Sequence, residues 1–340
     1  MNKSDVATGP TGRDQDLPFK PPGASRLGAA LLWEALAEVG LDGIIDIHVH
    51  PLPILSEEEL LGEIREAGVR RCVLLALDVD AGDLEGPDRK LRFMEEMFNA
   101  GIWNPRALEN AIEILRLART PNERVAELVE KHESLFLGFG SVNPARSSSY
   151  VADKLGEIGD LGLRGVKLIP TLQLFCPHKA KRNLRKILKF CRREGLVAMF
   201  HTGCDPGPWE SPALSECARP AYLAPFIRSF SQVDFVLAHA GSYSSLRPGI
   251  WFHEAVELAS RYPNVWLDVA AVPYLLTEPD FVGALRGRGL LSRVLFGSDY
   301  PVIGGSGVKE VAEIILSSTG LTVDEKAGVM ALNAERLLGL

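Results

Sequence analysis

The sequence predicts an α/β protein whose main unit is a distorted (β/α)8 barrel. Two observations predict this fold. Eight short, continuous apolar runs alternate with segments of helical periodicity along the 340 residues, and no glycine-rich phosphate loop follows the first run. Continuous apolar runs are typical of parallel strands buried on both faces, and repeated βα units imply right-handed crossovers between them. Eight such repeats favour closure into a barrel over an open doubly wound sheet.

The predicted elements follow one another regularly after an N-terminal segment. Residues 1–25 are rich in Gly, Pro and charged residues and are expected to form a flexible tail. The remainder, 26–340, is expected to be a single domain that opens with a helical extension over 26–40 covering the bottom of the barrel. Strands are predicted at 43–51, 69–78, 135–144, 163–170, 196–203, 233–241, 265–272 and 294–301. Helices are predicted at 56–68, 148–161, 179–195, 224–230, 250–262, 280–290, 308–318 and 323–338. An insertion over about 79–104 follows strand two and contains a helix predicted over 93–99. Helices over 105–119 and 121–132 are predicted after it.

Composition narrows the class of protein. A hydrophobic content of 46% is ample for a large core, and the net charge of −7 argues against nucleic acid or an anionic membrane as the main partner. The N-terminus lacks an apolar signal region, and no uninterrupted apolar run approaches the length of a membrane span. The five cysteines show no spacing typical of a disulfide framework, which favours a reducing compartment. The sequence therefore predicts a cytoplasmic protein.

The first predicted strand carries the most informative pattern. Asp46, His48 and His50 alternate with three aliphatic residues, so the two-residue period of a strand places them on one face. Two imidazoles that point the same way at the carboxyl end of a strand predict a divalent metal site, because neutral imidazole is a common ligand of zinc and its neighbours. The alternative interpretation is two buried histidines with ordinary hydrogen-bond partners.

Other predicted strands also end in polar residues, and chemistry in such barrels gathers at the carboxyl ends of strands. Strands four, five, six and eight carry, in that order, Lys167, His201, His239 and Asp299. Four of the seven histidines thus lie at strand ends. Because burying an unpaired charge is costly, Lys167 and Asp299 must have partners there. This set of residues is hard to explain without a metal.

This constellation resembles the amidohydrolase superfamily, and more specifically the amidohydrolase-related (amidohydrolase 2) branch of TIM-barrel metal-dependent hydrolases and decarboxylases. The resemblance covers about residues 43–340. It rests on Gly-Phe-Gly-Ser-Val-Asn-Pro (138–144), Gly-Val-Lys-Leu (165–168), Phe-His-Thr-Gly (200–203) and Phe-Gly-Ser-Asp-Tyr-Pro (296–301). One departure is Ile169, where members of the branch often have histidine.

The resemblance implies a ligand set and roles. His48, His50, His201 and Asp299 would hold one divalent ion, zinc in the first place and manganese or iron as alternatives. Asp299 would act as general base, and His239 would orient or protonate the substrate oxygen. Two ions are implied instead if Lys167 is carboxylated, whereas an unmodified ammonium would pair with Asp299 or bind a substrate carboxylate. Asp46 is expected to support the ligands rather than to be one of them.

Two reactions fit the same ligands. The first is hydrolysis of a C–N, C–O or lactone bond of a small molecule by a metal-activated water, and the alternative is non-oxidative decarboxylation of an aromatic or unsaturated acid. Arg146, Trp209 and Tyr243 lie on loops after strands three, five and six and are candidates to bind an acid substrate, although each alone is more typical of a structural residue. The basic helix 179–195 is expected to pack on the barrel with a solvated outer face, so no nucleic-acid partner is predicted. Barrels of this kind commonly form homodimers.

Overall fold

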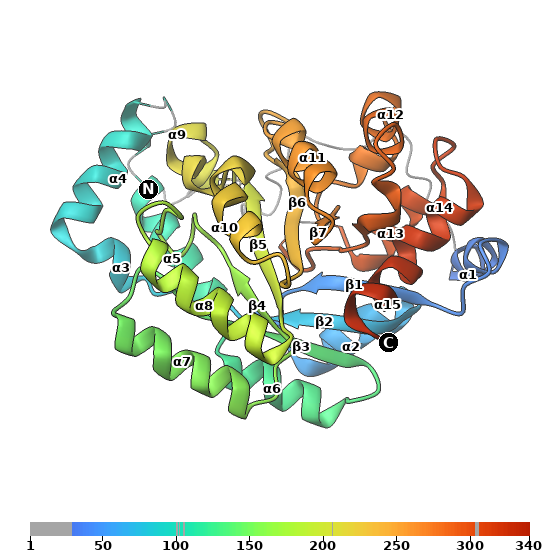
Figure 1. The fold of residues 1–340 in the computed structure, drawn as a ribbon, viewed down its shortest axis with the longest axis horizontal. Coiled ribbons are helices and arrows are strands. Elements are labelled where there is room, and N and C mark those ends of the chain that lie inside the picture. Colours follow the sequence, from blue (N-terminus) through green and yellow to red (C-terminus); the bar gives the residue numbers. More distant parts are fainter. Residues whose placement is uncertain (1–28, 100, 102, 105, 206, 303–305) are drawn as a thin grey trace, which may run out of the picture.

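Eight parallel strands form one sheet in the order β1-β2-β3-β4-β5-β6-β7-β8, which confirms the predicted barrel (Figure 1). The computed structural model describes residues 29–99, 101, 103–104, 106–205, 207–302 and 306–340, so the predicted tail 1–25 lies outside the described residues. The strands are β1 (Ile44–Val49), β2 (Val69–Leu75), β3 (Phe136–Ser141), β4 (Gly165–Leu168), β5 (Val197–Gly203), β6 (Phe235–Tyr243), β7 (Val265–Asp268) and β8 (Val294–Leu295).

The first and last strands meet and close the barrel. The N–H of Ile47 donates to the carbonyl of Phe296 at 3.1 Å, and beyond the end of β8 the N–H of Asp299 donates to the carbonyl of His48 at 2.9 Å. The N–H of His50 donates to the carbonyl of Tyr300 at 2.8 Å. The seam between β1 and β8 therefore runs directly past the two histidines of the first strand.

The helices lie around the outside of the sheet, with α6 to α8 along one side and α11 to α14 along another (Figure 1). They are α1 (Ala29–Glu38), α2 (Glu57–Glu66), α3 (Gly82–Glu85), α4 (Pro87–Asn99), α5 (Ala107–Ala118), α6 (Asn122–Lys131), α7 (Ser148–Asp160), α8 (Lys181–Glu194), α9 (Pro212–Ser215), α10 (Ala224–Ser229), α11 (Phe252–Arg261), α12 (Pro279–Arg286), α13 (Val308–Leu316), α14 (Val323–Ala327) and α15 (Asn333–Leu338). Short 3-10 turns connect several of them: η1 (Gly207–Trp209), η2 (Glu216–Ala218), η3 (Pro220–Leu223), η4 (Pro273–Leu276) and η5 (Leu291–Arg293). No helix among the described residues is both long and apolar enough to span a membrane.

The barrel interior is filled by alternate residues of the strands, among them Ile45, Ile47 and Met199. Ala331, Ala334 and Leu338 from the C-terminal segment belong to the same cluster. Leu32 and Leu36 of α1 belong instead to the cluster between the sheet and the surrounding helices. The expectation that the N-terminal helix covers the bottom of the barrel is therefore wrong, because the C-terminal residues fill that place. The helix predicted over 323–338 is interrupted there by a π-helical turn, η6 (Gly328–Leu332).

The predicted insertion after strand two is present as α3 and α4, and α5 follows it. The helix α4 starts at Pro87, six residues before the predicted start, and proline is well suited to the first turn of a helix. Residues of these helices pack with Leu77, Ile169 and Trp209 in a third apolar cluster, which we call the mouth cluster. Leu77 and Ile169 follow the carboxyl ends of β2 and β4, so the insertion covers part of the catalytic end of the barrel.

Gly165 allows close packing between two neighbouring strands. A Cβ on Gly165 of β4 would lie 2.6 Å from the Phe139 ring, so we expect Gly165→Ala to lower the free energy of unfolding by about 1–3 kcal/mol through overpacking. Gly156 of α7 has nothing within 4 Å of such a Cβ, so Gly156→Ala is the control and should stabilise by roughly 0.5–1 kcal/mol. Urea denaturation of both variants measures the difference. Equal stabilities would contradict the packing argument.

A disulfide joins Cys176 to Cys217, with 4.7 Å between their Cα atoms. The spacing of the cysteines along the chain did not indicate this bond. The two cysteines are 41 residues apart in sequence, and only the fold brings their loops together. Because structural disulfides are typical of oxidising compartments, the inference of a reducing compartment loses its support. Cys72, Cys191 and Cys204 are free and buried.

Candidate metal centre

The first strand contains an irregularity at the position of its histidines. Asp46 pairs with Cys72 of β2, but Val49 pairs with Leu74, so β1 has one more residue than β2 over this stretch. Such a bulge interrupts the two-residue alternation of side chains. Simple alternation, which predicts one common face for Asp46, His48 and His50, therefore does not hold through this strand.

Asp46 supports the backbone beneath the histidines. Its Oδ1 accepts the N–H groups of His48 at 2.9 Å and of Ser298 at 3.1 Å, and so ties β1 to the residues after β8. Its carboxyl is fully buried, and this burial raises its pKa to about 7. The contacts of Asp46 agree with the supporting role expected for it.

Two of the predicted site residues adopt left-handed backbone conformations. The φ angles of His239 and Asp299 are 61° and 63°, a region that costs a residue with a side chain about 1–2 kcal/mol. Such strain persists where the surrounding structure imposes it, and it is frequent at functional sites. Potential ligand atoms of His239, Asp299 and His48 lie within 4.8 Å of one another, so the strained backbone accompanies convergence of these side chains.

All six strand-end residues predicted for the site come together at the carboxyl end of the barrel. Asp299 Oδ1 lies 3.3 Å from His48 Nε2 and 3.2 Å from His50 Nε2. The ring centroid of His239 lies 4.9 Å from that of His48 and 4.8 Å from that of His201. Lys167 Nζ lies 2.9 Å from His48 Nε2. All six side chains are buried, with at most 4% of any residue exposed.

Asp268, the last residue of β7, is a site residue that the sequence interpretation missed. Its Oδ2 lies 2.9 Å from His48 Nδ1, and its Oδ1 accepts the N–H of His239 at 2.7 Å. A carboxylate on Nδ1 fixes the tautomer of His48, so Nε2 carries the lone pair. The carbonyl of Ala270 does the same for His239, whose Nδ1 it meets at 2.8 Å. The sequence did contain a signal for Asp268, because it is a charged residue at the end of an apolar strand, as Lys167 is.

The electrostatics of the cluster favour neutral histidines. Burial lowers the pKa values of His48 and His201 well below 6.5, and the charge of Lys167 adds to this effect for both. Burial also lowers the pKa of Lys167 to about 8. Burial alone would raise the pKa of Asp299, but the hydrogen bond with His50 and the other imidazoles outweigh it and lower that pKa. At neutral pH the site therefore combines imidazole lone pairs with a carboxylate.

The donor atoms of this cluster fit a divalent metal ion. His201 Nε2 and Asp299 Oδ2 are buried and have no hydrogen-bond partner, although His201 Nε2 lies 3.4 Å from Asp205 Oδ2. Unpaired buried polar atoms are costly, and neutral imidazole with carboxylate is a typical zinc donor set. Lys167 occupies the lone pair of His48 Nε2, so an ion bound to that nitrogen requires the ammonium to move or to be modified.

The sequence matches the family model for amidohydrolases (Amidohydro_2) over residues 45–340. The chain belongs to the amidohydrolase family. Among curated proteins no match is found. Similar solved structures include an uncharacterized TIM-barrel protein from Bordetella bronchiseptica, 22% identical, which covers 87% of this chain and 98% of its own with a TM-score of 0.63.

Two other similar structures are named as enzymes of different reaction types. A probable 2-pyrone-4,6-dicarboxylic acid hydrolase from Acinetobacter baumannii is 14% identical over 88% of this amidohydrolase and 100% of its own chain, with a TM-score of 0.57. A 5-carboxyvanillate decarboxylase from Novosphingobium aromaticivorans, in complex with manganese and a nitrobenzoic acid, is 12% identical over 89% and 97%, with a TM-score of 0.57. The family therefore has neighbours that include both hydrolases and decarboxylases.

Two of the three candidate substrate-binding residues lie at or over the catalytic end of this amidohydrolase. The Tyr243 ring stacks on His239 with 4.4 Å between centroids and lies 5.7 Å from His201. Trp209 is 1% exposed and belongs to the mouth cluster, where its ring lies 5.5 Å from Phe93 of α4. The Trp209 Nε1 atom is buried without a partner, so a hydrogen-bond donor is available within this apolar cluster.

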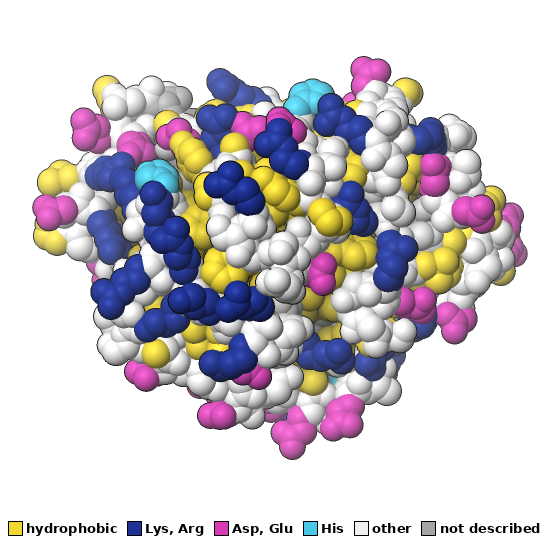
Figure 2. Space-filling view, viewed as in Figure 1, with side chains coloured by type: hydrophobic (Ala, Val, Ile, Leu, Met, Phe, Trp, Pro, Cys, Tyr) yellow, Lys and Arg dark blue, Asp and Glu magenta, His cyan; other side chains and the backbone are white. Residues whose placement is uncertain are grey.

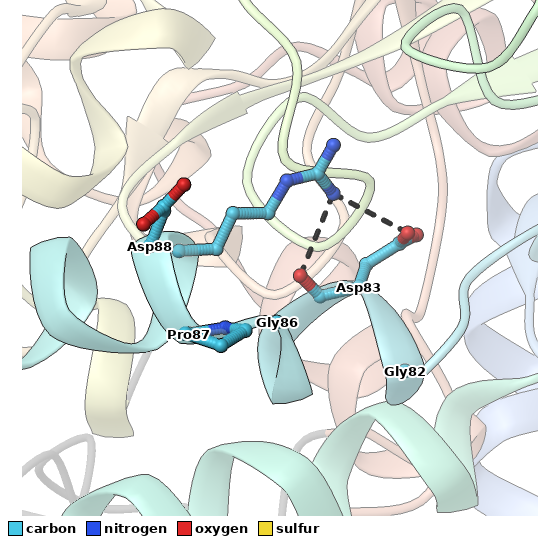
Figure 3. Close-up of a pocket in the computed structure, with 6 residues that line it drawn as sticks. Gly82, Asp83, Gly86, Pro87 and Asp88 are labelled. Carbon is cyan, nitrogen blue, oxygen red and sulfur yellow. Dashed lines mark hydrogen bonds and ion pairs between the residues drawn. The ribbon is translucent and has the colours of Figure 1, made fainter.

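Arg146 is held by the insertion instead. Its Nη2 lies 2.9 Å from Asp83 Oδ2 and 3.3 Å from Asp80 Oδ2. Asp83 also pairs with Arg89 at 3.3 Å. Both residues line a surface hollow of about 310 Å³, and Figure 3 shows Asp83 on the helical turn before Gly86 and Pro87. A guanidinium with two carboxylate partners is poorly placed to clamp an acid substrate, and the structure gives Arg146 no contact with the histidine cluster.

Asp205 is a second site residue that the sequence interpretation missed. It follows β5, its Oδ2 accepts the hydroxyl of Thr171, and the same atom faces His201 Nε2. Burial raises its pKa to about 7. An acidic residue in a loop rich in Pro and Gly gives no periodic signal, so its position next to His201 becomes evident only in the folded chain.

Proposed function

We propose that this amidohydrolase is a metal-dependent hydrolase that cleaves a C–N, C–O or lactone bond of a small molecule. The observation that supports this most directly is the buried cluster of neutral imidazoles around the Asp299 carboxylate, with the His201 and Asp299 donor atoms unpaired. His48, His50, His201 and Asp299 would hold one ion, for which we propose zinc. His239 lies close enough to His48 and Asp299 to be a further ligand.

When bound, the ion supplies Lewis-acid polarisation of the substrate and lowers the pKa of water. The residues of the chain supply the remaining steps. Asp299 is ionised at neutral pH, and its unpaired Oδ2 can accept a proton from the attacking water and pass it to the leaving group. His239, whose Nδ1 is engaged by the Ala270 carbonyl, can present Nε2 to a substrate oxygen. Tyr243 stacks on that ring and limits its rotation.

The second candidate function is non-oxidative decarboxylation of an aromatic or unsaturated acid. Two observations favour it. The mouth cluster places the buried Trp209 in an apolar layer of Phe93, Ile169 and neighbouring residues, which suits a planar apolar substrate. The buried ammonium of Lys167 can compensate the charge of a substrate carboxylate. The same proposed metal ligands serve both reactions.

Metal content and product analysis test these proposals together. Protein purified without chelator should contain about one equivalent of zinc by elemental analysis, since a single cluster of this type holds one ion. His201→Ala should lose it, whereas His253→Ala, on the surface helix α11, should retain it. Activity is then measured on lactones, amides and aromatic carboxylates. Acid release without CO2 would support hydrolysis, and CO2 release would support decarboxylation. Absence of stoichiometric metal after loading with zinc, manganese or iron would contradict both.

We also propose that the partner is a small-molecule substrate, without nucleic acid or membrane, and that the chain forms a homodimer. Sedimentation of the purified protein tests the latter. A cytoplasmic location stays a prediction, and the Cys176–Cys217 disulfide weighs against it. Fractionation of cells that express the full chain tests the location.

A further inference from the structure

A hollow on the outer surface is separate from the histidine cluster. It lies between the start of α8 and the segment formed by η3 and α10, and its volume is about 240 Å³. Its lining residues are His178, Lys181, Arg185, Ala221, Tyr222, Pro225 and Phe226. None of them belongs to the metal centre.

One wall of the hollow is cationic and uncompensated. Lys181 and Arg185 are four residues apart and so lie on one face of α8. Within the described part of the chain, no carboxylate lies within ion-pair distance of Lys181, Arg185 or His178. The nearby Glu216 accepts the hydroxyl of Tyr222 at 2.6 Å. The whole chain has a net charge of −7, so the positive charge of this wall is a local feature and does not reflect the overall composition.

The cationic wall belongs to a larger basic face. The helix α8 contains seven Lys and Arg residues but one acid, Glu194, which pairs with Arg193. Figure 2 shows Lys and Arg side chains gathered over the region of α8. Lys181 is also the first residue of this helix, where the helix dipole adds positive potential. Anions are therefore attracted to this end of the face.

The opposite wall is aromatic and apolar. The Tyr222 ring on this wall meets the ring of His178, from the loop before α8, edge to face with 5.3 Å between centroids. Phe226 is 5% exposed, and Ala221 and Pro225 complete this side of the hollow. A flat group can rest on such a surface while an attached anion meets the cationic wall.

The disulfide connects the two walls. Cys176 precedes His178 by two residues, and Cys217 precedes Tyr222 by five, so the bond joins the loop before α8 to the turn before η3. Restraining both walls in one arrangement reduces the entropy cost of ligand binding. The bond therefore preorganises this hollow.

We propose that the hollow binds a small phosphate monoester that carries a flat ring. The Lys181 ammonium and the Arg185 guanidinium match a phosphate dianion in charge, and a guanidinium can contact two of its oxygens at once. The Tyr222 ring and the apolar side chains beside it receive the ring of the ligand. The site is independent of the reaction proposed for the metal centre.

Calorimetric titration at low salt with adenosine monophosphate, inorganic phosphate and adenosine tests the site. We expect saturable binding of the monophosphate, weaker binding of phosphate and the weakest binding of adenosine. Arg185→Gln and Lys181→Gln should each weaken monophosphate binding about 10-fold or more, because a charge-assisted contact is lost. Arg182→Gln is the control, since Arg182 is exposed on the same helix but does not line the hollow, and it should change affinity less than about 3-fold.

Further variants separate this site from the alternatives. Asp299→Asn should leave monophosphate binding unchanged, and Cys176→Ser with Cys217→Ser should weaken it several-fold. The proposal would be overturned by equal effects of Arg182→Gln and Arg185→Gln, which indicate a diffuse basic surface, or by loss of binding in Asp299→Asn, which places the ligand at the metal centre. Absence of saturable binding in the wild-type protein would overturn it as well. An unchanged affinity in the double serine variant would refute the role of the disulfide.

Discussion

Asp299→Asn is expected to lower kcat/KM by about 10³-fold or more, because general acid–base catalysis alone contributes about 10²–10⁴-fold and the carboxylate is also a proposed metal ligand. The amide is isosteric but cannot accept a proton at neutral pH, and it presents a donor to one of the imidazoles that now face Asp299 Oδ1. Steady-state kinetics on a substrate identified from the panel, with metal content measured in parallel, gives the result.

Asp153→Asn is the matched control for this substitution. Asp153 is an exposed residue of α7, and its replacement should leave kcat/KM unchanged. If Asp299→Asn retained activity within about 10-fold of wild type, a general-base role would be ruled out, since that loss is below the usual range for such a group.

Asp268→Asn is expected to weaken metal affinity by about 10–100-fold, the usual effect of removing a carboxylate that orients a histidine ligand. The Asn amide group can turn a donor toward His48 Nδ1, which favours the tautomer that removes the lone pair from Nε2. It also removes a charge from the acceptor of the His239 N–H. Competition with a metal-chelating dye measures the affinity, and activity at saturating metal should recover in part.

Asp234→Asn is the control for Asp268→Asn. Asp234 directly precedes β6, at the opposite end of the barrel, and its Oδ1 accepts the indole N–H of Trp266 at 2.9 Å. This variant should lower the melting temperature slightly without changing metal affinity. Equal metal affinities of the two variants would show that the Asp268 contact with His48 does not serve the metal centre.

The sequence predicted the strands and most of the residues that converge at the carboxyl end of the barrel, because both depend on local patterns. Lys167 and His201 were predicted because each is a polar residue near the end of an apolar strand, and both lie within strands of the barrel. His239 and Asp299 are aimed by left-handed backbone conformations, which periodicity does not encode. His239 and Asp299 were nevertheless predicted, because a polar residue at the end of an apolar strand is unusual whichever way its side chain points.

The parts that were missed depend on contacts between distant segments. Asp268 contacts His48, which lies 220 residues earlier in the sequence, and the two bridged cysteines lie on separate loops. Arg146 was a candidate substrate ligand because it follows a strand, and only the folded chain shows that it pairs with Asp80 and Asp83 of the insertion. The position of an insertion relative to the barrel follows from packing of the mouth cluster, which no single segment specifies.

The proposed metal centre forms only where β1 and the segment after β8 pair at the seam of the barrel. His48 and His50 come from the first strand, and Asp299 follows the last one, with backbone hydrogen bonds joining the two segments. A folding intermediate that lacks either strand has no such centre. An ion held by residues of both segments would add its binding free energy to the stability of the paired strands. Hydrogen exchange at the amides of His50 and Asp299 should therefore slow more on metal binding than exchange at strand β3, which carries none of the residues proposed for the centre.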